Sequence, residues 1–382
     1  MTKDDGFTII VYAIMLVAAI FIGTQIIGPA LSDLNLSTSG ERYGFAIIAI
    51  VLGALLSSII FEVGHLIGAK LGGYMILSIN IWGLSIYREG KKWKFGFKSF
   101  EGLTGEVKIA PKKENANPRW YLWGPTILFL IEVVILLFVY VNTPSEPPFT
   151  GSSVPAFIHH SSLIFIAVGA MLAIYNIVPF KLDTINDGYQ LVLISNKVNV
   201  EAFNELRRID GAYTLQQPVG DIKTFEQITT LTTEVNLRAI YELQYKNEDE
   251  AALELIESID ISEVQLDPIM KARLYAQKIW VLIKLGKIEE VEKLWESLTT
   301  KTKKAIGDDT NLETIRVYFL YSGVVAKSIH ESTYAINRLP KERRKKRKHP
   351  RFDEETKLMS DAIALVRQTN PDWQIALRKE AK

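Results

Sequence analysis

A glutamate and a histidine stand three positions apart in the apolar stretch "SSIIFEVGHLIGAKLGGY", Ser57 to Tyr74. Residues i and i+4 of a helix share a face, so positions 61 and 65 are spaced like the two histidines of a zinc-binding H-E-x-x-H helix. In that motif two imidazoles hold the metal, and the glutamate beside the first acts as general base on metal-bound water. Glu62 and His65 match the base and the second ligand. Phe61, at the first-ligand position, has no lone pair to donate.

A second group of polar residues follows an apolar segment in "YNIVPFKLDTINDGYQLVLI". Pro179 should end or kink a helix, and Asp187-Gly188 is a turn signal. A carboxylate from this segment could complete a zinc site that leaves one position open for water. Asp187 is the preferred ligand, and Asp183 is the second choice.

The composition indicates a chain with one very apolar part and one charged part. Of 382 residues, 48% are hydrophobic and 23% are charged, with a net charge of +1. The absence of cysteine excludes disulfides, cysteine-based metal sites and thiol catalysis. Four apolar stretches are long enough to cross a bilayer, and they predict spans at about 7–31, 44–69, 120–141 and 156–180.

The positive charges between the spans predict a topology. The connection between the second and third spans carries ten basic residues, whereas the other two connections carry only Arg42 and none. By the positive-inside rule this loop and both termini are cytoplasmic. A multi-pass protein of a bacterial plasma membrane is expected. The ten residues are Lys70, Arg88, Lys91, Lys92, Lys94, Lys98, Lys108, Lys112, Lys113 and Arg119.

The same loop alternates apolar and charged residues with the period of a β-strand. In "KKWKFGFK" the side chains of Trp93, Phe95 and Phe97 alternate with lysines. This predicts a membrane-associated β hairpin over about residues 74–110. Its aromatic face could bind substrate beside an edge strand, or it could rest at the bilayer interface.

From about residue 197 onward the sequence predicts helices in a cytoplasmic domain. "NEDEAALELIESI" and "GKIEEVEKLWESL" share a pattern at an offset of 39 residues, and an apolar-periodic stretch precedes each. This helix-turn-helix repetition is similar to tetratricopeptide repeats with a longer period. An ordinary helical bundle is the alternative.

Taken in order, these motifs resemble the site-2 protease family of intramembrane metalloproteases. The matching features are the "FEVGHLIGAKLGG" helix, the β region after it, Gly124-Pro125 opening the next span, and Asn176, Pro179 and Asp187-Gly188 near the last one. The resemblance covers roughly residues 44–195.

We therefore expect a polytopic helical membrane domain at residues 1–196 that resembles this family, followed by the helical domain at 197–382. The resemblance implies a zinc metalloendopeptidase that cleaves a peptide bond in or near a substrate's transmembrane segment. Glu62 would be the general base, His65 and Asp187 the metal ligands, and Asn176 a substrate-positioning residue. The expected substrate is a membrane protein or a peptide precursor.

Phe61 departs from this pattern and predicts that the chain as written is catalytically impaired. Retention of Glu62, His65 and Asp187 favours a recent or engineered loss of one ligand. A natural pseudoprotease that binds a membrane protein or peptide precursor without cutting it is the alternative. A transporter is a weaker third class, because the four spans contain no inverted repeat.

Other polar residues have simpler interpretations. Glu132 inside the third span is expected to face the bundle interior, as a structural partner or as part of the site. His159 and His160 are expected near an interface. The basic run Lys341 to Arg351 could contact anionic lipid, and the helical domain could bind a cytoplasmic partner. Nothing in the sequence indicates nucleic-acid binding.

Overall fold

The computed structural model describes residues 3–33, 38–90, 92–97, 105–145, 154–179, 185–261, 266–346 and 351–373. The chain forms two compact units, Met1–Gln217 and Pro218–Lys382. The structure is mostly helical, with one small antiparallel sheet in the first unit.

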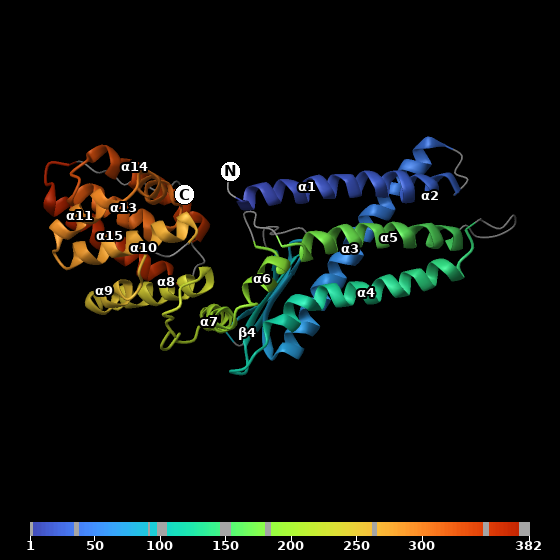
Figure 1. Cartoon of the computed structure of the whole chain (residues 1–382), viewed down its shortest axis with the longest axis horizontal. Helices are drawn as coiled ribbons and strands as arrows, with labels where there is room; N and C mark the ends of the chain where they lie inside the picture. Colours follow the sequence, from blue (N-terminus) through green and yellow to red (C-terminus); the bar gives the residue numbers. More distant parts are fainter. Residues whose placement is uncertain are drawn as a thin grey trace. The chain divides into compact units, whose positions relative to one another are not determined.

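Four helical segments of the first unit are long and apolar enough to cross a membrane. The first consists of α1 (Lys3–Ile22), a π-helical turn η1 (Gly23–Ile27) and α2 (Gly28–Asp33). The other three are α3 (Ser39–Gly72), α4 (Pro118–Asn142) and α5 (Val154–Ile177). These three pack on one another in the first unit (Figure 1). The four segments correspond to the predicted spans, although their bounds differ by several residues.

Local sequence signals explain where the long helices begin and end. Thr38 and Glu41 form a capping box at the start of α3, and Asn117 caps α4 directly before Pro118. α5 ends at Ile177, two residues before Pro179, as the proline predicted. The first span is interrupted at η1, because Pro29 has no N–H to continue the helical hydrogen bonds.

The β region is a four-stranded antiparallel sheet rather than a single hairpin. Its strands are β1 (Tyr74–Ile81), β2 (Leu84–Glu89), β3 (Lys92–Phe97) and β4 (Gly105–Pro111), in the order β3-β2-β1-β4. β4 pairs with β1, a long-range pairing that period-2 alternation cannot predict. The sheet follows α3 directly, since only Gly73 separates Gly72 from β1.

One face of the sheet exposes apolar side chains. The β2–β3 register pairs Leu84 with Phe97 and Ile86 with Phe95, so these residues lie on the same face. Phe97 is 83% exposed and Phe95 is 65% exposed. An exposed apolar surface of this kind marks a contact with another molecule or a membrane.

Two further helices complete the first unit, namely the short α6 (Asp187–Leu193) and the longer α7 (Lys197–Thr214). α7 packs on β4, and a side chain on Gly211 would overlap Ala110. Asn204 accepts a hydrogen bond from the Tyr74 hydroxyl at 2.5 Å and donates one to the carbonyl of Ala116 at 2.8 Å. These contacts explain why the compact unit ends at Gln217 rather than at residue 196, where the sequence suggested a boundary.

The second unit consists of helices. They are α8 (Thr230–Tyr245), α9 (Asp249–Glu257), α10 (Pro268–Lys284), α11 (Ile288–Ser297), α12 (Thr300–Asp308), α13 (Leu312–Val324), α14 (Ile329–Lys346) and α15 (Phe352–Thr369). The two similar sequence segments form α9 and α11. A residue with positive φ turns the chain before each of them, Asn247 at 60° and Gly286 at 75°, and these residues are also 39 positions apart. The resemblance to tetratricopeptide repeats remains a prediction.

A buried charge pair lies in the core of the second unit. Arg316 on α13 is fully buried, and its Nε donates to Glu355 Oε1 on α15 at 2.7 Å. Its Nη2 donates to Gln244 on α8 at 3.1 Å, and the guanidinium lies 3.8 Å from the centre of the Trp280 ring on α10. One side chain therefore joins four helices.

Candidate functional site

The site begins with a close approach between α3 and α4. A Cβ added to Gly64 would lie 2.6 Å from the carbonyl oxygen of Gly124, and one added to Gly68 would overlap the carbonyl of Trp120. Small residues at such a crossing let two helix backbones touch. The face of α3 that carries Gly64 and Gly68 is thereby held against the first turns of α4, and His65 lies beside Tyr121.

His65 is buried and contacts two acceptor oxygens. Its Nδ1 lies 3.1 Å from the main-chain oxygen of Tyr121, and its Nε2 lies 3.2 Å from Oδ2 of Asp187. Since a carbonyl only accepts, Nδ1 carries the proton and donates to Tyr121. Metal-binding histidines are commonly oriented in this way, with one nitrogen donating to a carbonyl and the other facing the site.

Asp187 reaches His65 because the start of α6 packs against the end of α5. Asn176 on α5 donates from Nδ2 to Oδ2 of Asp187 at 2.8 Å. Asn186 caps α6 by accepting from the main-chain N–H of Tyr189 at 2.9 Å. The Asn186 Nδ2 also donates to two main-chain oxygens at the end of α5, those of Tyr175 at 2.8 Å and Val178 at 2.7 Å.

Gly188 is required for the same junction. A Cβ at this position would overlap the carbonyl oxygen of Ile177 at the end of α5. The expected Asp-Gly turn is therefore the first turn of α6, and its glycine permits a close approach to α5. The structure brings the predicted residues His65, Asp187 and Asn176 into direct contact.

Glu62 lies one turn before His65 on α3 and is 1% exposed. A Cβ on Gly105, at the start of β4, would lie 3.1 Å from the carboxyl carbon of Glu62. The glutamate therefore lies between α3 and the β4 end of the sheet. It is also close enough to His65 to act on it electrostatically. The predicted general base and the predicted ligand belong to one buried polar group.

Phe61 belongs to an apolar cluster next to these polar residues. Its side chain is 2% exposed and packs with Phe129 of α4 and Ala173 of α5. The centres of the Phe61 and Phe129 rings are 5.9 Å apart. Ala173 lies one turn before Asn176 on α5, so the Phe61 cluster is about one helical turn from the Asn176–Asp187 contact.

The residues present fit a catalytic zinc only in part. In a tetrahedral site with bonds of about 2.0–2.1 Å, neighbouring donor atoms lie roughly 3.3–3.4 Å apart. The 3.2 Å between His65 Nε2 and Asp187 Oδ2 agrees with this spacing. A catalytic site needs three protein ligands, and no group of three or more His, Cys, Asp or Glu side chains in the described part of the chain could hold a metal. With Phe61 in place, the site lacks one donor.

Comparisons of the chain with protein-family models, curated proteins and solved structures find no match. The function is therefore argued from the geometry of the residues around His65.

Three residues predicted to bind substrate lie away from the polar group around His65. Trp93, Phe95 and Phe97 belong to β3, whereas Glu62 adjoins β4 at the opposite edge of the sheet. With strands about 4.8 Å apart, the two edges are separated by roughly 14 Å. The aromatic residues form a separate surface, and they do not line the His65–Asp187 site.

The remaining polar residues of the long helices also lie elsewhere. Glu132 is buried on α4, about 16 Å along the helix axis from Tyr121, so it is not part of the site. His159 Nδ1 contacts the main-chain oxygens of Tyr140 and Thr143 at 2.8 Å, and His160 Nε2 contacts that of Ser145 at 3.0 Å. Both histidines interact with the end of α4. Asp183 and part of the run Lys341–Arg351 fall outside the described residues.

Two contributors to the site were not predicted. Tyr121 offers its main-chain oxygen to His65, and its hydroxyl donates to the main-chain oxygen of Val107 on β4 at 2.8 Å. Asn186 fixes Asp187 by capping α6. The sequence contains a signal for Asn186, because asparagine before a short polar turn is a typical N-cap. It contains none for Tyr121, which acts at the site through a main-chain atom.

Proposed function

We propose that the chain is a site-2-type intramembrane metalloprotease that has lost its first zinc ligand at position 61. The contact of His65, Asp187 and Asn176, with Glu62 beside them, carries this proposal. Burying a glutamate and a histidine in a helix of this length and hydropathy costs free energy within a bilayer, and such residues usually have a function. A catalytic role in peptide hydrolysis would explain why both are present.

Each residue of the site would have a separate role in hydrolysis. The Tyr121 carbonyl and Asn176 hold His65 and Asp187 in a fixed geometry. Zinc, when bound in a complete site, would supply an activated water molecule, and Glu62 would accept its proton. Because the first-ligand position carries Phe61, we expect negligible hydrolysis by this chain and only weak zinc binding.

The sheet and the helical unit would present the substrate. The exposed apolar face of β2 and β3 suits a surface that meets the membrane interface or an emerging substrate segment. The substrate would be a membrane protein or peptide precursor with a span that enters the site. The second unit would bind a cytoplasmic partner, and basic residues near Lys341 would meet anionic lipid of a bacterial plasma membrane.

Peptidase activity of restored variants tests this proposal. Phe61→His is assayed against a panel of single-span substrates in detergent, beside the chain as written and the double variant Phe61→His, Glu62→Gln. Cleavage by Phe61→His alone, removed by chelation, is expected. Equal cleavage by all three proteins would contradict the assignment of Glu62 and of position 61.

A natural pseudoprotease is the second candidate, and the packing of Phe61 favours it. The ring is almost fully buried against Phe129 and Ala173, so the surroundings of position 61 accept a large apolar side chain. A scaffold would use the same fold to hold a membrane protein or peptide precursor intact. Retention of a bound precursor by the chain as written, with no gain of cleavage in Phe61→His, would support this candidate.

A further inference from the structure

The end of α3 and the start of α4 meet in the first unit. The main-chain oxygen of Gly72 accepts a hydrogen bond from the N–H of Asn117 at 2.8 Å, and that of Gly73 accepts one from the N–H of Lys112 at 3.0 Å. These bonds hold the segment between β4 and α4 beside the last turn of α3. Residues at this junction therefore share one depth when α3 and α4 cross a bilayer.

Four basic side chains are exposed at this junction, and we name them the basic junction. They are Lys70 in the last turn of α3, Lys112 and Lys113 after β4, and Arg119 in the first turn of α4. A Cβ on Gly73 would lie 3.7 Å from Lys113 Cδ, so this lysine extends along the end of α3. None of the four is ion-paired among the residues that the structure describes. Glu114 is the only acidic residue from Pro111 to Trp123, so the local charge is strongly positive.

The tryptophans next to the basic junction indicate its depth. Trp120 is 48% exposed and Trp123 is 42% exposed, both in the first two turns of α4. The exposed residues from Ile127 to Val141 on the same helix are all apolar. Basic residues, then tryptophans, then apolar residues form the order along a span that runs from water through the interface into hydrocarbon. The basic junction therefore lies at the level of lipid headgroups.

We propose that the basic junction binds anionic phospholipids of the cytoplasmic leaflet. The ammonium groups of its lysines and the guanidinium of Arg119 would donate hydrogen bonds to headgroup phosphates. Its position beside interfacial tryptophans favours a lipid over a soluble anion as the source of these phosphates. This inference rests on α3 and α4 crossing a membrane, as the proposed function requires, and not on hydrolysis by the chain.

Bound lipid would also stabilise the helix crossing at the His65 site. A Cβ on Gly68 would overlap the carbonyl of Trp120, and the next residue, Tyr121, accepts the hydrogen bond of His65. Lys70 and Arg119 belong to the two helices that cross here. Headgroups bound by both residues would therefore hold α3 and α4 together where His65 lies beside Tyr121.

The lipid selectivity of the purified full-length chain tests this proposal. The chain as written is reconstituted in phosphatidylcholine vesicles with a trace of spin-labelled phosphatidylglycerol or spin-labelled phosphatidylcholine. Electron paramagnetic resonance then measures the fraction of each labelled lipid that the protein immobilises. Phosphatidylglycerol should be preferred by at least about threefold, because it brings an anionic headgroup to surface cations. High salt should reduce this preference, since it screens exposed charges.

A fourfold variant identifies the residues that bind the lipid. It combines Lys70→Gln, Lys112→Gln, Lys113→Gln and Arg119→Gln, and its preference for phosphatidylglycerol should fall at least about threefold. All four side chains are exposed, so the variant should fold, and an unchanged helical circular dichroism spectrum would verify this. The single variants Lys112→Gln and Arg119→Gln should each give a smaller decrease.

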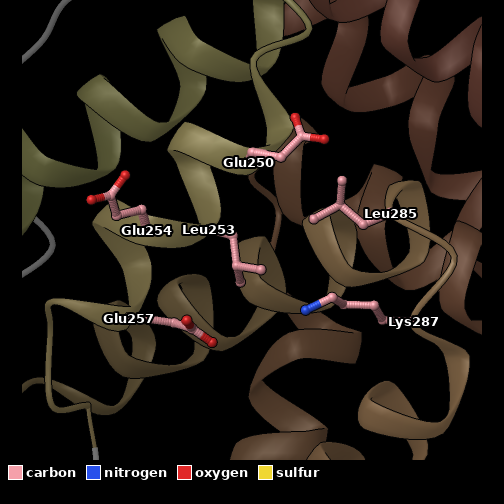
Figure 2. A pocket seen from close by; sticks show the side chains of 6 residues that line it. All are labelled: Glu250, Leu253, Glu254, Glu257, Leu285 and Lys287. Atoms are coloured by element: carbon pink, nitrogen blue, oxygen red, sulfur yellow. The ribbon is translucent and has the colours of Figure 1, made fainter.

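A control variant removes the same number of charges from the second unit. It combines Lys278→Gln, Lys287→Gln, Lys293→Gln and Lys301→Gln, and the preference should stay unchanged. Lys278 and Lys287 are already paired with glutamates, at 3.3 and 3.4 Å. Figure 2 shows Lys287 at a hollow of about 430 Å³ whose other charged residues are Glu250, Glu254 and Glu257. The surroundings of this lysine are acidic, unlike those of the basic junction.

Three results would overturn the proposal. The first is equal immobilisation of both lipids by the chain as written, and the second is a similar decrease in the two fourfold variants. The third is displacement of labelled phosphatidylglycerol by inorganic phosphate at equal ionic strength, which would identify a soluble anion as the ligand. These measurements need neither zinc nor hydrolysis, so an inactive Phe61→His would contradict the proposed function and leave this inference unaffected.

Discussion

His65 Nε2 lies 3.2 Å from Asp187 Oδ2, although the two residues are 122 positions apart in the chain. The contact depends on the close crossing of α3 and α4 and on the start of α6 beneath α5. Asn176 adds a hydrogen bond of 2.8 Å to the same carboxylate oxygen. Side chains from α3, α5 and α6 thus form one small polar centre inside an otherwise apolar helix group.

Removal of the Asp187 carboxylate should destabilise this centre. Asp187→Ala leaves the Asn176 side-chain amide without its acceptor in a buried position, at a cost of about 1–3 kcal/mol. The expected result is a lower thermal unfolding midpoint in detergent and faster hydrogen exchange in α6. Asp210→Asn on α7 is the control, because its carboxylate is 45% exposed and its pair with Arg207 spans 3.8 Å. A similar decrease in the unfolding midpoint of both variants would contradict the role of Asp187 in this centre.

The close approach of α3 and α4 at Gly68 leads to a second prediction. Gly68→Val should prevent the close approach, because even a Cβ at this position overlaps the Trp120 carbonyl. Overpacking of this kind costs about 1–3 kcal/mol or more, so a loss of stability and of folded yield is expected. Gly44→Ala provides the comparison within the same helix, since a Cβ there meets nothing within 4 Å. Normal folding of Gly68→Val would show that the crossing is misplaced.

Parts of this arrangement were predictable from local patterns. The apolar lengths predicted four spans, and Pro179 predicted the end of α5, since both depend on neighbouring residues alone. The contact between His65 and Asp187 was predicted from ligand chemistry and the family resemblance. The partner of His65 Nδ1 was not predictable, because the Tyr121 main-chain oxygen carries no residue-specific signal.

The sheet shows where local patterns are insufficient. Alternation at Trp93, Phe95 and Phe97 correctly predicted a strand, but the pairing of β4 with β1 is set by tertiary contacts. That pairing places Glu62 at the β4 edge and β3 at the other edge. The strand order sets the distance between β3 and the His65–Asp187 site. The alternating pattern of the sequence does not indicate the strand order, so this distance was not predictable.

The buried pair in the second unit allows a third prediction. Arg316→Met removes one partner of a fully buried ion pair, a change that typically costs about 3–5 kcal/mol. The amides of α13 and α15 should exchange much faster in the full-length variant. Lys278→Met removes the Lys278–Glu257 pair, whose glutamate is 52% exposed, and should change stability by less than about 1 kcal/mol. Comparable effects of the two substitutions would refute a structural role of Arg316.

A fall in pH should weaken the ion pair between Arg273 and Asp309 in the second unit. Burial tends to raise the pKa of Asp309, but the hydrogen bonds and charge of Arg273, at 2.9 Å, hold it below its ordinary value. The pair therefore stabilises the fold at any pH above the unfolded pKa of about 3.9, and this stability is lost as the pH falls through the lower folded pKa.

Asp309→Asn should remove this acid dependence. The variant is expected to be less stable at neutral pH, and the stability difference from the unmodified chain should narrow below about pH 4. Denaturant unfolding, monitored by hydrogen exchange of α10 and α13 from neutral to acid pH, provides the measurement. A difference that stays constant over this range would contradict the direction of the Asp309 pKa shift.

Zinc content per chain tests the central claim most directly. The chain as written, Phe61→His, and Phe61→His combined with His65→Ala are purified in parallel, equilibrated with zinc and desalted before metal analysis. We predict close to one zinc per chain for Phe61→His and little for the other two, because only that variant offers three protein ligands. Zinc should also raise the thermal unfolding midpoint of Phe61→His alone, since a ligand that binds only the folded state stabilises it. If Phe61→His binds no more zinc than the chain as written, position 61 is not the missing ligand and the assignment of His65 and Asp187 to a metal site is wrong.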